Sequence, residues 1–458
     1  MLPLTHSTDR PPPPAAGPLF TDLYELTMLQ AYDAEAMDGA AVFELFFREL
    51  PSQWNYVVAA GVEQAIRDAL AWRFSAEELS YLRSTGKLSR RLIDRLEGWR
   101  FTGDIDAVAE GTPVFGHEPI ARVEAPIFDA QLLETLMINR VMFPSLAASK
   151  ASRIVHAAAG RNVVDFGARR AHGPEAAMAV ARSSYLAGFS ATSFVEAGRR
   201  LGIPVTGTMA HSYILAHDDE AAAFEAFMRE FPETVLLVDT YDTLAGVEKV
   251  IEIANRLGDD FKVRAIRLDS GDMAELSKQA RRRLDDAGLN DLEILASSGL
   301  DEFEIARLVG ADAPIDSFGV GTKLAVSDHA PHIDIAYKLV QYDGQPRMKL
   351  SSDKANPPGA KQVFRVIEDG EMRHDILARK DEEAPPNAQP LLQPVVRAGK
   401  PVENALPDLN EIREHAAEAI GQLPGWLRGV KVAEPPYRVQ RSDELNALAQ
   451  SLRASIEE

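Results

Sequence analysis

One pattern occurs six times between Asn162 and Thr322: a short apolar run, a polar or glycine-rich cluster, and then a helical stretch. The runs with their clusters are VVDFGARR (163–170), VTGTMAHS (205–212), VLLVDT (235–240), AIRLDSGD (265–272), ILASSG (294–299) and FGVGT (318–322). Apolar runs this short are typical of parallel strands that are buried on both faces. Each cluster then lies at the carboxyl end of its strand, on the rim where α/β barrels and open α/β sheets bind ligands. The pattern therefore predicts an enzyme with its site on this rim.

The composition narrows the class of protein. A chain of 458 residues is too long for one core, so we expect two domains. It has no cysteine, which excludes disulfides, thiolate catalysis and thiolate metal sites. We find neither an apolar stretch of about 20 residues nor a secretory signal, and expect a cytoplasmic protein with no membrane partner. The net charge of −20 argues against nucleic-acid partners and requires local arginines for any anionic substrate.

The segments outside the repeated pattern predict a second domain. Residues 1–17, with four consecutive prolines, are expected to be a disordered leader. Residues 18–125 are expected to form an N-terminal α+β domain. Its elements are a helix over Thr21–Ala34, a strand over Ala41–Phe47, a helix opened by the capping box Ser75–Glu78, and short strands within Asp104–Val123. A mostly helical stretch, Ala130–His156, leads into the barrel, for which we expect residues 126–334.

The strands that follow the barrel do not fit its parallel order. Ile333–Val340 and Arg347–Ser351 flank the hairpin turn YDGQ (342–345), and Val363–Ile367 is a further strand. We expect residues from about 335 to 400 to return to the N-terminal domain, and residues 401–458 to be an acidic, helical extension. The predicted fold is an irregular TIM-like α/β barrel of mostly parallel strands, with an α+β N-terminal domain completed by later strands.

Two successive clusters have the composition of phosphate-binding loops. Ser297-Ser298-Gly299 and Gly319-Val320-Gly321-Thr322 contain glycines, which let backbone amides approach a phosphate closely. The last two strands of α/β barrels commonly carry such a site. Either cluster alone could be a tight turn, but two in succession favour phosphate binding.

The cluster RLDSGD (267–272) places two carboxylates and a hydroxyl on one turn. Such a cluster suits a ribose diol or a Mg²⁺ ion that bridges phosphate oxygens. The alternative is a helix cap, with Asp269 or Ser270 capping and Asp272 complementing the helix dipole. Asp239, at the end of the preceding strand, could share the diol or metal role.

Cationic and titratable side chains complete the rim. His211 follows Gly207-Thr208, and a lone histidine is more often structural than catalytic, but this one lies on the predicted rim. Arg169 and Arg170 form a candidate clamp for a carboxylate or phosphate through the fork geometry of guanidinium. Their alternative is a solvated surface pair.

Six blocks of the sequence together resemble nicotinate phosphoribosyltransferases. The blocks are TDLY (21–24), FGARR (166–170), GTMAHS (207–212), RLDSGD (267–272), FGVGT (318–322) and GQPRMKL (344–350). The resemblance runs from about Leu19 to Arg365, with every block in the family's order. It implies a type II phosphoribosyltransferase that joins nicotinate to phosphoribosyl pyrophosphate, giving nicotinate mononucleotide and pyrophosphate in NAD salvage. ATP hydrolysis assists the reaction, and Mg²⁺ is the expected cofactor.

The resemblance also implies roles for residues. His211, which ATP would phosphorylate, and Asp269, near the ribose, are the catalytic candidates. Tyr24 would stack on the pyridine ring, in trans within the homodimer that the resemblance implies. The candidate substrate-binding residues are Tyr24, Phe166, Arg169, Arg170, Ser193, Thr208 and Arg267. The phosphate-binding candidates are Ser298, Gly299, Gly319, Gly321 and Thr322, and the metal candidates are Asp239 and Asp272.

Three other functions remain as alternatives. Nicotinamide phosphoribosyltransferases carry an aspartate about where this chain has Ser193, and that aspartate would repel a carboxylate substrate, which favours nicotinate. Quinolinate phosphoribosyltransferases use no ATP and have no counterpart of the Gly207–Ser212 block or the long C-terminal extension. A catalytically idle homologue that senses nucleotides would be expected to lack His211, Asp269 or the loop glycines, all of which are present.

Overall fold

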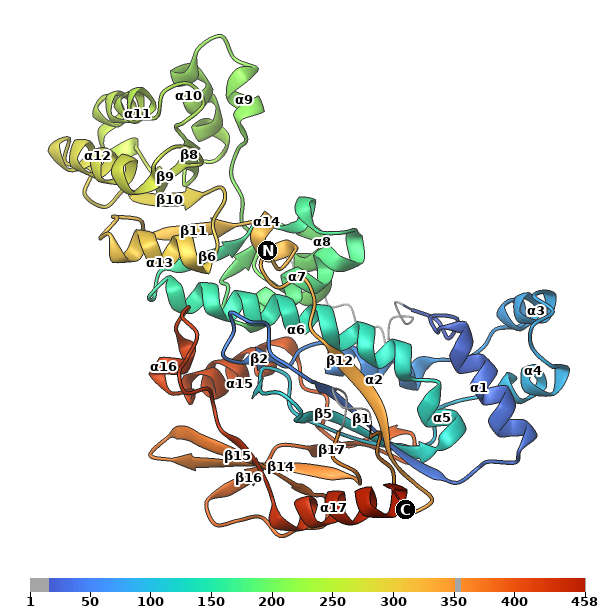
Figure 1. Ribbon diagram of the computed structural model, residues 1–458. Coiled ribbons are helices and arrows are strands. Elements are labelled where there is room, and N and C mark those ends of the chain that lie inside the picture. Colours follow the sequence, from blue (N-terminus) through green and yellow to red (C-terminus); the bar gives the residue numbers. More distant parts are fainter. Residues whose placement is uncertain (1–15, 351–355, 458) are drawn as a thin grey trace.

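The computed structural model describes residues 16–350 and 356–457, and its chain folds around three larger sheets (Figure 1). The first is a six-stranded parallel sheet, which forms a half-barrel. Its strand order is β7 (Ala191–Thr192), β6 (Asn162–Asp165), β11 (Ser317–Val320), β10 (Glu293–Ser297), β9 (Ala265–Leu268) and β8 (Val235–Leu237). Five of the six apolar runs are therefore parallel strands. The predicted combination of a parallel α/β sheet with a separate N-terminal part is confirmed.

The sixth run is not a strand, and this prediction was wrong. Val205 makes one isolated bridge, to Thr192, and residues 206–210 have no regular structure. Val205, Thr206 and Gly207 are exposed, so the run lacks the two-sided burial that the other five share. The short strand β7 takes the edge position instead, and the ladder is open between β7 and β8.

Helices follow the strands of the half-barrel in the expected alternation. They are α7 (Pro174–Leu186), α8 (Val195–Leu201), α9 (His211–Leu215), α10 (Glu220–Glu230), α11 (Thr243–Leu257), α12 (Met273–Asp286), α13 (Glu302–Gly310) and α14 (Thr322–Ala325). Four of them begin at an aspartate whose side chain accepts a backbone N–H of the first turn: Asp219, Asp242, Asp272 and Asp301. These caps satisfy N–H groups that would otherwise have no partner at the helix start.

The second sheet is antiparallel and combines strands from distant parts of the chain. Its order is β13 (Gln345–Pro346), β12 (Ile335–Tyr342), β1 (Ala40–Phe47), β5 (Pro119–Pro126), β3 (Asp104–Ala107), β17 (Gln393–Arg397) and β18 (Lys400–Pro401). The late strands thus pair with N-terminal ones, with β12 against β1 and β17 against β3. Asp343 and Gly344 have φ values of 52° and 73°, as a two-residue hairpin turn requires. The strand expected over Arg347–Ser351 is wrong for 347–350, since β13 ends at Pro346.

A third sheet was not expected. It has the order β16 (Ala388–Pro390), β14 (Lys361–Glu368), β15 (Glu371–Arg379) and β19 (Val439–Arg441), so residues 361–390 do not all join the N-terminal sheet. Near it lie α15 (Leu409–Gly421), α16 (Gly425–Arg428) and α17 (Asp443–Glu457) (Figure 1). The division of the chain into domains stays a prediction, and the proposed leader falls outside the described residues up to residue 15.

The helix α6 (Glu134–Ala157) runs between the parallel and antiparallel sheets (Figure 1). It packs on α7 and α13 of the half-barrel and on α2 (Val62–Ala71), β2 (Val57–Val58) and β12 on the other side. Gly61, with φ of 84°, lies against it so closely that a Cβ there would overlap the carbonyl oxygen of Arg140. Pro144 has no N–H to donate to that carbonyl, so a glycine approaches where the helical ladder is interrupted.

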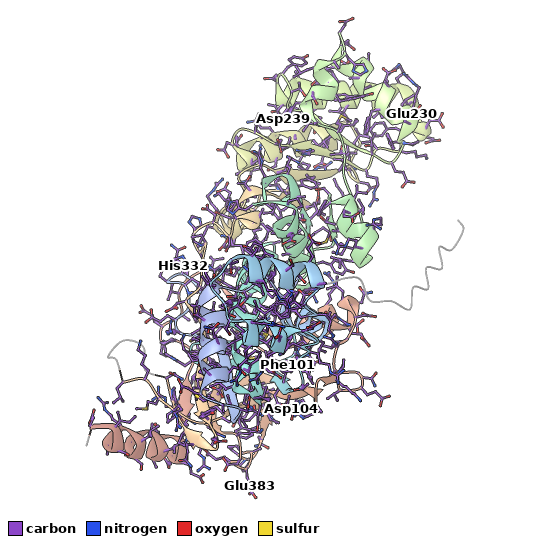
Figure 2. The ribbon with its side chains drawn as sticks, turned by 90° about the vertical axis from the view of Figure 1, so that its right-hand side faces the viewer. Phe101, Asp104, Glu230, Asp239, His332 and Glu383 are labelled. Carbon is purple, nitrogen blue, oxygen red and sulfur yellow. The ribbon has the colours of Figure 1, made fainter. Side chains whose placement is uncertain are left out.

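The helix α5 (Ile127–Gln131) packs on β1 and β5, and α1 (Leu23–Ala34) packs on α5 and on α4 (Arg90–Leu96). The helix α3 (Ala76–Ser84) packs on α4, and β4 (Pro113–Val114) pairs with β2 in a two-stranded sheet. Ser75 and Glu78 form the predicted capping box at the start of α3. Figure 2 shows the elongated shape of the chain, with Asp239 near one end and Asp104 and Glu383 near the other. Within residues 16–350 and 356–457, no helix combines the length and apolarity that a bilayer span requires.

Candidate functional site

The candidate site lies where the strands of the half-barrel end. Because β6, β11, β10, β9 and β8 are parallel neighbours, the residues that follow them emerge at one edge. Asp239 follows β8, Asp269 follows β9, and Ser297 is the last residue of β10. Phe166 follows β6 on the same side, and its backbone N–H donates to the carbonyl of Val320 over 2.8 Å. The structure therefore gathers the predicted clusters at one rim, except for the one that precedes His211.

His211 is brought to this rim by a side-chain contact. It is the first residue of α9, and its Nε2 lies 3.2 Å from Oδ1 of Asp239. The Asp239 side chain is fully buried, while that of His211 is 39% exposed. The imidazole thus has one nitrogen against a buried carboxylate and an accessible side toward solvent. A carboxylate partner fixes the tautomer and ring orientation of a histidine.

Asp239 is itself fixed by the loop after β9. Its Oδ2 accepts the backbone N–H of Asp269 over 3.1 Å and the hydroxyl of Ser270 over 2.6 Å. Both carboxylate oxygens are therefore occupied by protein donors, which favours a role in orienting His211. The carboxylate of Asp239 therefore has few lone pairs left for the predicted metal ion.

Arg267 occupies the centre of the network. Its Nε donates to Ser297 Oγ over 2.8 Å, its Nη2 to Asp269 Oδ1 over 2.8 Å, and its Nη1 to the carbonyl of Met209 over 3.3 Å. Its guanidinium carbon also lies 5.6 Å from the ring centre of Phe166. This buried side chain thus connects β9, β10, the segment before His211 and the loop after β6. Its observed contacts are to protein, and its predicted contact with substrate stays a prediction.

The surroundings of Asp269 keep it ionised. Burial raises the pKa of its carboxyl, but hydrogen bonds from Ser297 and Arg267, with the nearby His211, outweigh burial and hold the pKa below its usual value. Arg267 and Ser297 both contact Oδ1. No described hydrogen bond reaches Oδ2, so that oxygen is available to a ligand hydroxyl or a cation.

Gly319 and Gly299, in and after the last two strands, are glycines for different structural reasons. A Cβ on Gly319 would lie 2.5 Å from the ring of Phe166, so this glycine makes room for an aromatic side chain. Ser298 and Gly299 have φ values of 80° and 63° and are exposed, and a Cβ on Gly299 would meet nothing within 4 Å. Steric crowding therefore does not explain Gly299, whereas two successive left-handed residues form the kind of turn that presents backbone N–H groups to an anion.

The arginine pair is exposed at the end of β6. Arg169 and Arg170 lie in a single 3₁₀ turn, Ala168–Arg170, and neither side chain has a described partner among residues 16–350 and 356–457. Behind them, Asp165 accepts the N–H of Gly167 and the hydroxyl of Thr192, both over 2.7 Å. This buried carboxylate orders the turn. Its burial raises its pKa, against the lowering effect of both hydrogen bonds.

Of the other predicted substrate-binding residues, Ser193 and Thr208 lie near the rim and Tyr24 does not. Ser193 lies beside the arginine turn, with its N–H on the carbonyl of Asp165 at 2.8 Å. The Thr208 hydroxyl donates to the carbonyl of Val235, so it ties the segment before His211 to β8. Tyr24 lies on α1, which packs on α4 and α5 and lies away from the half-barrel (Figure 1). It is 46% exposed, and burial together with nearby Glu134 raises its pKa.

The carboxylates fit a metal only in part. Asp272 caps α12, with Oδ1 accepting the N–H groups of Ala274 and Glu275 over 3.1 and 3.3 Å, as its alternative interpretation states. Among the described residues of the rim, Oδ2 of Asp269 and Oδ2 of Asp272 accept no described hydrogen bond. Mg²⁺ commonly uses one or two protein carboxylates together with substrate phosphates, and the rim can supply that number.

Sequence reasoning missed three contributors to the rim. Ser297 was noted only as part of a glycine cluster, yet it bridges Arg267 and Asp269. Asp165 orders the arginine turn, and the carbonyl of Met209 binds Arg267. A polar residue at the last position of an otherwise apolar strand was the available signal for Ser297 and Asp165. No side-chain pattern could have indicated the carbonyl.

Comparisons with known proteins find relatives in sequence and in structure. Residues 19–142 match the nicotinate phosphoribosyltransferase N-terminal domain, and residues 161–364 match the nicotinate phosphoribosyltransferase family. The chain is 53% identical over 429 residues to nicotinate phosphoribosyltransferase pncB2 of Mycobacterium tuberculosis, covering 94% of this chain and 92% of that protein. It is 43% identical over 375 residues to a Bacillus subtilis nicotinate phosphoribosyltransferase, covering 80% and 76%. The crystal structure of human nicotinic acid phosphoribosyltransferase superposes with a TM-score of 0.84 at 28% identity, over 94% of this chain and 99% of that one.

Proposed function

The chain belongs to the nicotinate phosphoribosyltransferase family, and we propose that it joins nicotinate to phosphoribosyl pyrophosphate, forming nicotinate mononucleotide and pyrophosphate. The observation that carries this proposal is the convergence of His211, Asp239, Arg267 and Asp269 beside an unpaired arginine turn and two glycine loops. We propose that this nicotinate mononucleotide enters NAD salvage.

The chemistry requires charge stabilisation more than acid–base catalysis. The bond from C1 of the ribose to pyrophosphate breaks, a cation-like centre develops at C1, and the pyridine nitrogen bonds to it. Ser298, Gly299, Gly321 and Thr322 would hold the ribose phosphate through backbone N–H groups and hydroxyls. The free Oδ2 of Asp269 would accept a ribose hydroxyl. Mg²⁺, when bound with the substrate, would neutralise charge on the leaving pyrophosphate.

We further propose that ATP phosphorylates His211. Nε2 faces Asp239, so the phosphoryl group would transfer from ATP to Nδ1, leaving ADP, and Asp239 would stabilise the positive charge on the ring. Hydrolysis of the phosphohistidine then releases phosphate. The 39% exposure of the His211 side chain leaves room for this attack, and the buried carboxylate keeps the ring oriented.

The choice of nicotinate over nicotinamide rests on the arginine turn. Arg169 and Arg170 are exposed cations beside Ser193, which can donate a hydrogen bond to a carboxylate. An amide substrate would favour an acceptor at that position instead. Nicotinamide phosphoribosyltransferase is therefore the second candidate, and a catalytically idle sensor is the third.

A homodimer would bring Tyr24 to the site. Because Tyr24 lies far from the rim of its own chain, its proposed stacking on the pyridine ring requires the α1 of a partner subunit. Phosphorylated substrates do not cross bilayers, so we place the reaction in the cytoplasm. We propose no nucleic-acid or membrane partner, in keeping with the net charge of −20.

Release of pyrophosphate tests the proposal directly. The purified chain is mixed with phosphoribosyl pyrophosphate, Mg²⁺ and either nicotinate or nicotinamide, with and without ATP. We expect pyrophosphate and nicotinate mononucleotide with nicotinate, and more product with ATP. Turnover with nicotinamide alone would support the second candidate, and thermal stabilisation without turnover would support the sensor.

A further inference from the structure

We propose that Asp301 and Lys323 form a clasp that sets the spacing between the two loops assigned above to the ribose phosphate. The two residues are positioning residues, and neither needs to touch the substrate. The inference rests on the proposed function for the identity of the ligand, but its geometry is independent of it.

The clasp joins the loops just beyond the point where their strands separate. β10 and β11 run in parallel register, and their last paired residues are Ser297 and Gly319. Past this point the chain continues into the Ser298–Gly299 loop on one side and the Gly321–Thr322 loop on the other. Nζ of Lys323 lies 2.7 Å from Oδ2 of Asp301, which restores a connection across the gap.

Asp301 is fixed at both oxygens. Oδ1 caps α13 by accepting the N–H of Phe303 over 3.1 Å and that of Glu304 over 2.8 Å, while Oδ2 accepts Lys323. The Asp301 side chain is 4% exposed and that of Lys323 is 33% exposed. Burial raises the pKa of Asp301, but the bonds from Lys323 and Glu304 outweigh it, so the carboxyl pKa lies below its usual value. The carboxylate is therefore charged and correctly oriented for the lysine.

The residues beneath the clasp are bound to α6 by buried ion pairs. Glu302, the next residue, is fully buried and pairs with Lys150 at 2.7 Å and Arg153 at 3.2 Å, both on α6. Lys150 also donates to the carbonyl of Asp328, just after α14, over 2.8 Å. The helices behind both loops are thus tied to α6. The Asp301–Lys323 pair adds a contact nearer to the loops themselves.

Lys323 and His329 both contact the carboxylate of Asp301. His329 Nε2 lies 3.4 Å from Asp301 Oδ2 and 3.6 Å from Asp328 Oδ2. These three side chains form the group of possible metal ligands found among the described residues. The ammonium of Lys323, at 2.7 Å from Asp301 Oδ2, is closer than His329 Nε2 at 3.4 Å, so Lys323 is the nearer partner of this carboxylate.

A phosphate held by two loops binds well only when both present their donors at the correct separation. Binding of the whole chain to ribose 5-phosphate, measured by calorimetry, reports on this separation without requiring turnover. The variants are Asp301→Asn, which keeps a capping oxygen but removes the charge, Lys323→Met, which keeps the length, and the double variant. Lys323→Arg is the conservative rescue.

We expect each single variant to bind ribose 5-phosphate about tenfold more weakly and to raise the KM for phosphoribosyl pyrophosphate similarly. The double variant should be no weaker than either single one, because a clasp is lost only once. The KM for nicotinate should change less than about twofold, and Lys323→Arg should recover most of the affinity.

Other outcomes overturn the clasp. A loss in Lys323→Met with a wild-type-like Asp301→Asn would make Lys323 a direct phosphate ligand. An additive double variant, or parallel changes in both KM values with a large fall in Tm, would also contradict it, as would a wild-type chain that does not bind ribose 5-phosphate. If the wild-type chain binds ribose 5-phosphate but forms no nicotinate mononucleotide, the proposed function fails while the clasp result stands.

Discussion

The two sides of the rim are held in different ways. On the phosphate side, comprising Ser298, Gly299, Gly321 and Thr322, each loop directly follows a buried strand. On the histidine side, comprising the segment 205–211, Val205, Thr206, Gly207 and Ala210 are exposed, and the segment makes one strand bridge, at Val205. There, side chains place His211: Asp239 binds its ring, Arg267 binds the carbonyl of Met209, and Thr208 binds the carbonyl of Val235.

This difference separates two ways of building a site. Backbone loops that follow buried strands are fixed by the sheet, so substitutions of surface side chains there should have local effects. A residue that depends on distant side chains is sensitive to substitutions that it does not contact. Substitutions at four positions test this difference between the two sides.

The largest effect is expected on the histidine side. In His211→Ala, ATP hydrolysis coupled to nicotinate should fall to background, about a thousandfold or more, because the proposed phosphoryl acceptor is gone. Ribose 5-phosphate binding should be retained, since the phosphate side is intact. His217→Ala is the control, because His217 lies just after α9 and contacts the carbonyl and the ring of Tyr213 rather than Asp239. Coupled hydrolysis that persists in His211→Ala would contradict the assignment.

Arg267→Met should break the connection between the two sides. Removing the guanidinium leaves Asp269 and Ser297 without their cationic partner, so we expect the free energy of unfolding to fall by about 3 kcal/mol. Chemical denaturation measures this loss. Arg264→Met is the matched control, since that arginine is exposed three residues earlier. Equal losses in both variants would show that the buried network contributes nothing particular.

Arg169→Ala should separate the two substrates. We expect the KM for nicotinate to rise about tenfold to a hundredfold, as for a lost charged hydrogen bond, with little change in that for phosphoribosyl pyrophosphate. Steady-state kinetics with Arg170→Ala as the companion variant decides which arginine binds the carboxylate. Equal effects of Arg169→Ala on both substrates would move this residue to another role.

The smallest effect is expected at the hydrogen bond from Ser297 to Asp269. The pKa of Asp269 lies below its usual value, so its contribution to stability is present above the pKa of the unfolded chain and is lost as pH falls through the folded value. Ser297→Ala removes one bond and should move this loss to higher pH, at a cost of about 1 kcal/mol near neutral pH. Denaturation between pH 3 and 7, which spans the ordinary range for carboxyls, measures the shift. Ser277→Ala, a buried serine on α12, should leave the pH profile unchanged.

Sequence patterns predicted the phosphate side better than the histidine side. The apolar runs before Ser298 and Gly321 are buried strands, because two-sided burial leaves a clear signal in the sequence. The run from Val205 has similar composition, but its environment is exposed, and composition alone does not reveal that. The Asp239–His211 contact joins residues 28 positions apart across the open edge, so it depends on tertiary geometry. The third sheet was missed because its strands follow one another with no repeated period.

The pairing of β1 with β12 affects how the chain folds during synthesis on the ribosome. Roughly 290 residues separate these strands, so at ribosomal speeds of about 5–20 residues per second β1 waits some 15–60 s for that neighbour. The half-barrel, which is encoded in between, is complete beforehand and can fold first. A fragment that stops before Ile335 would leave the edge of β1 uncovered and should aggregate rather than yield an isolated N-terminal unit.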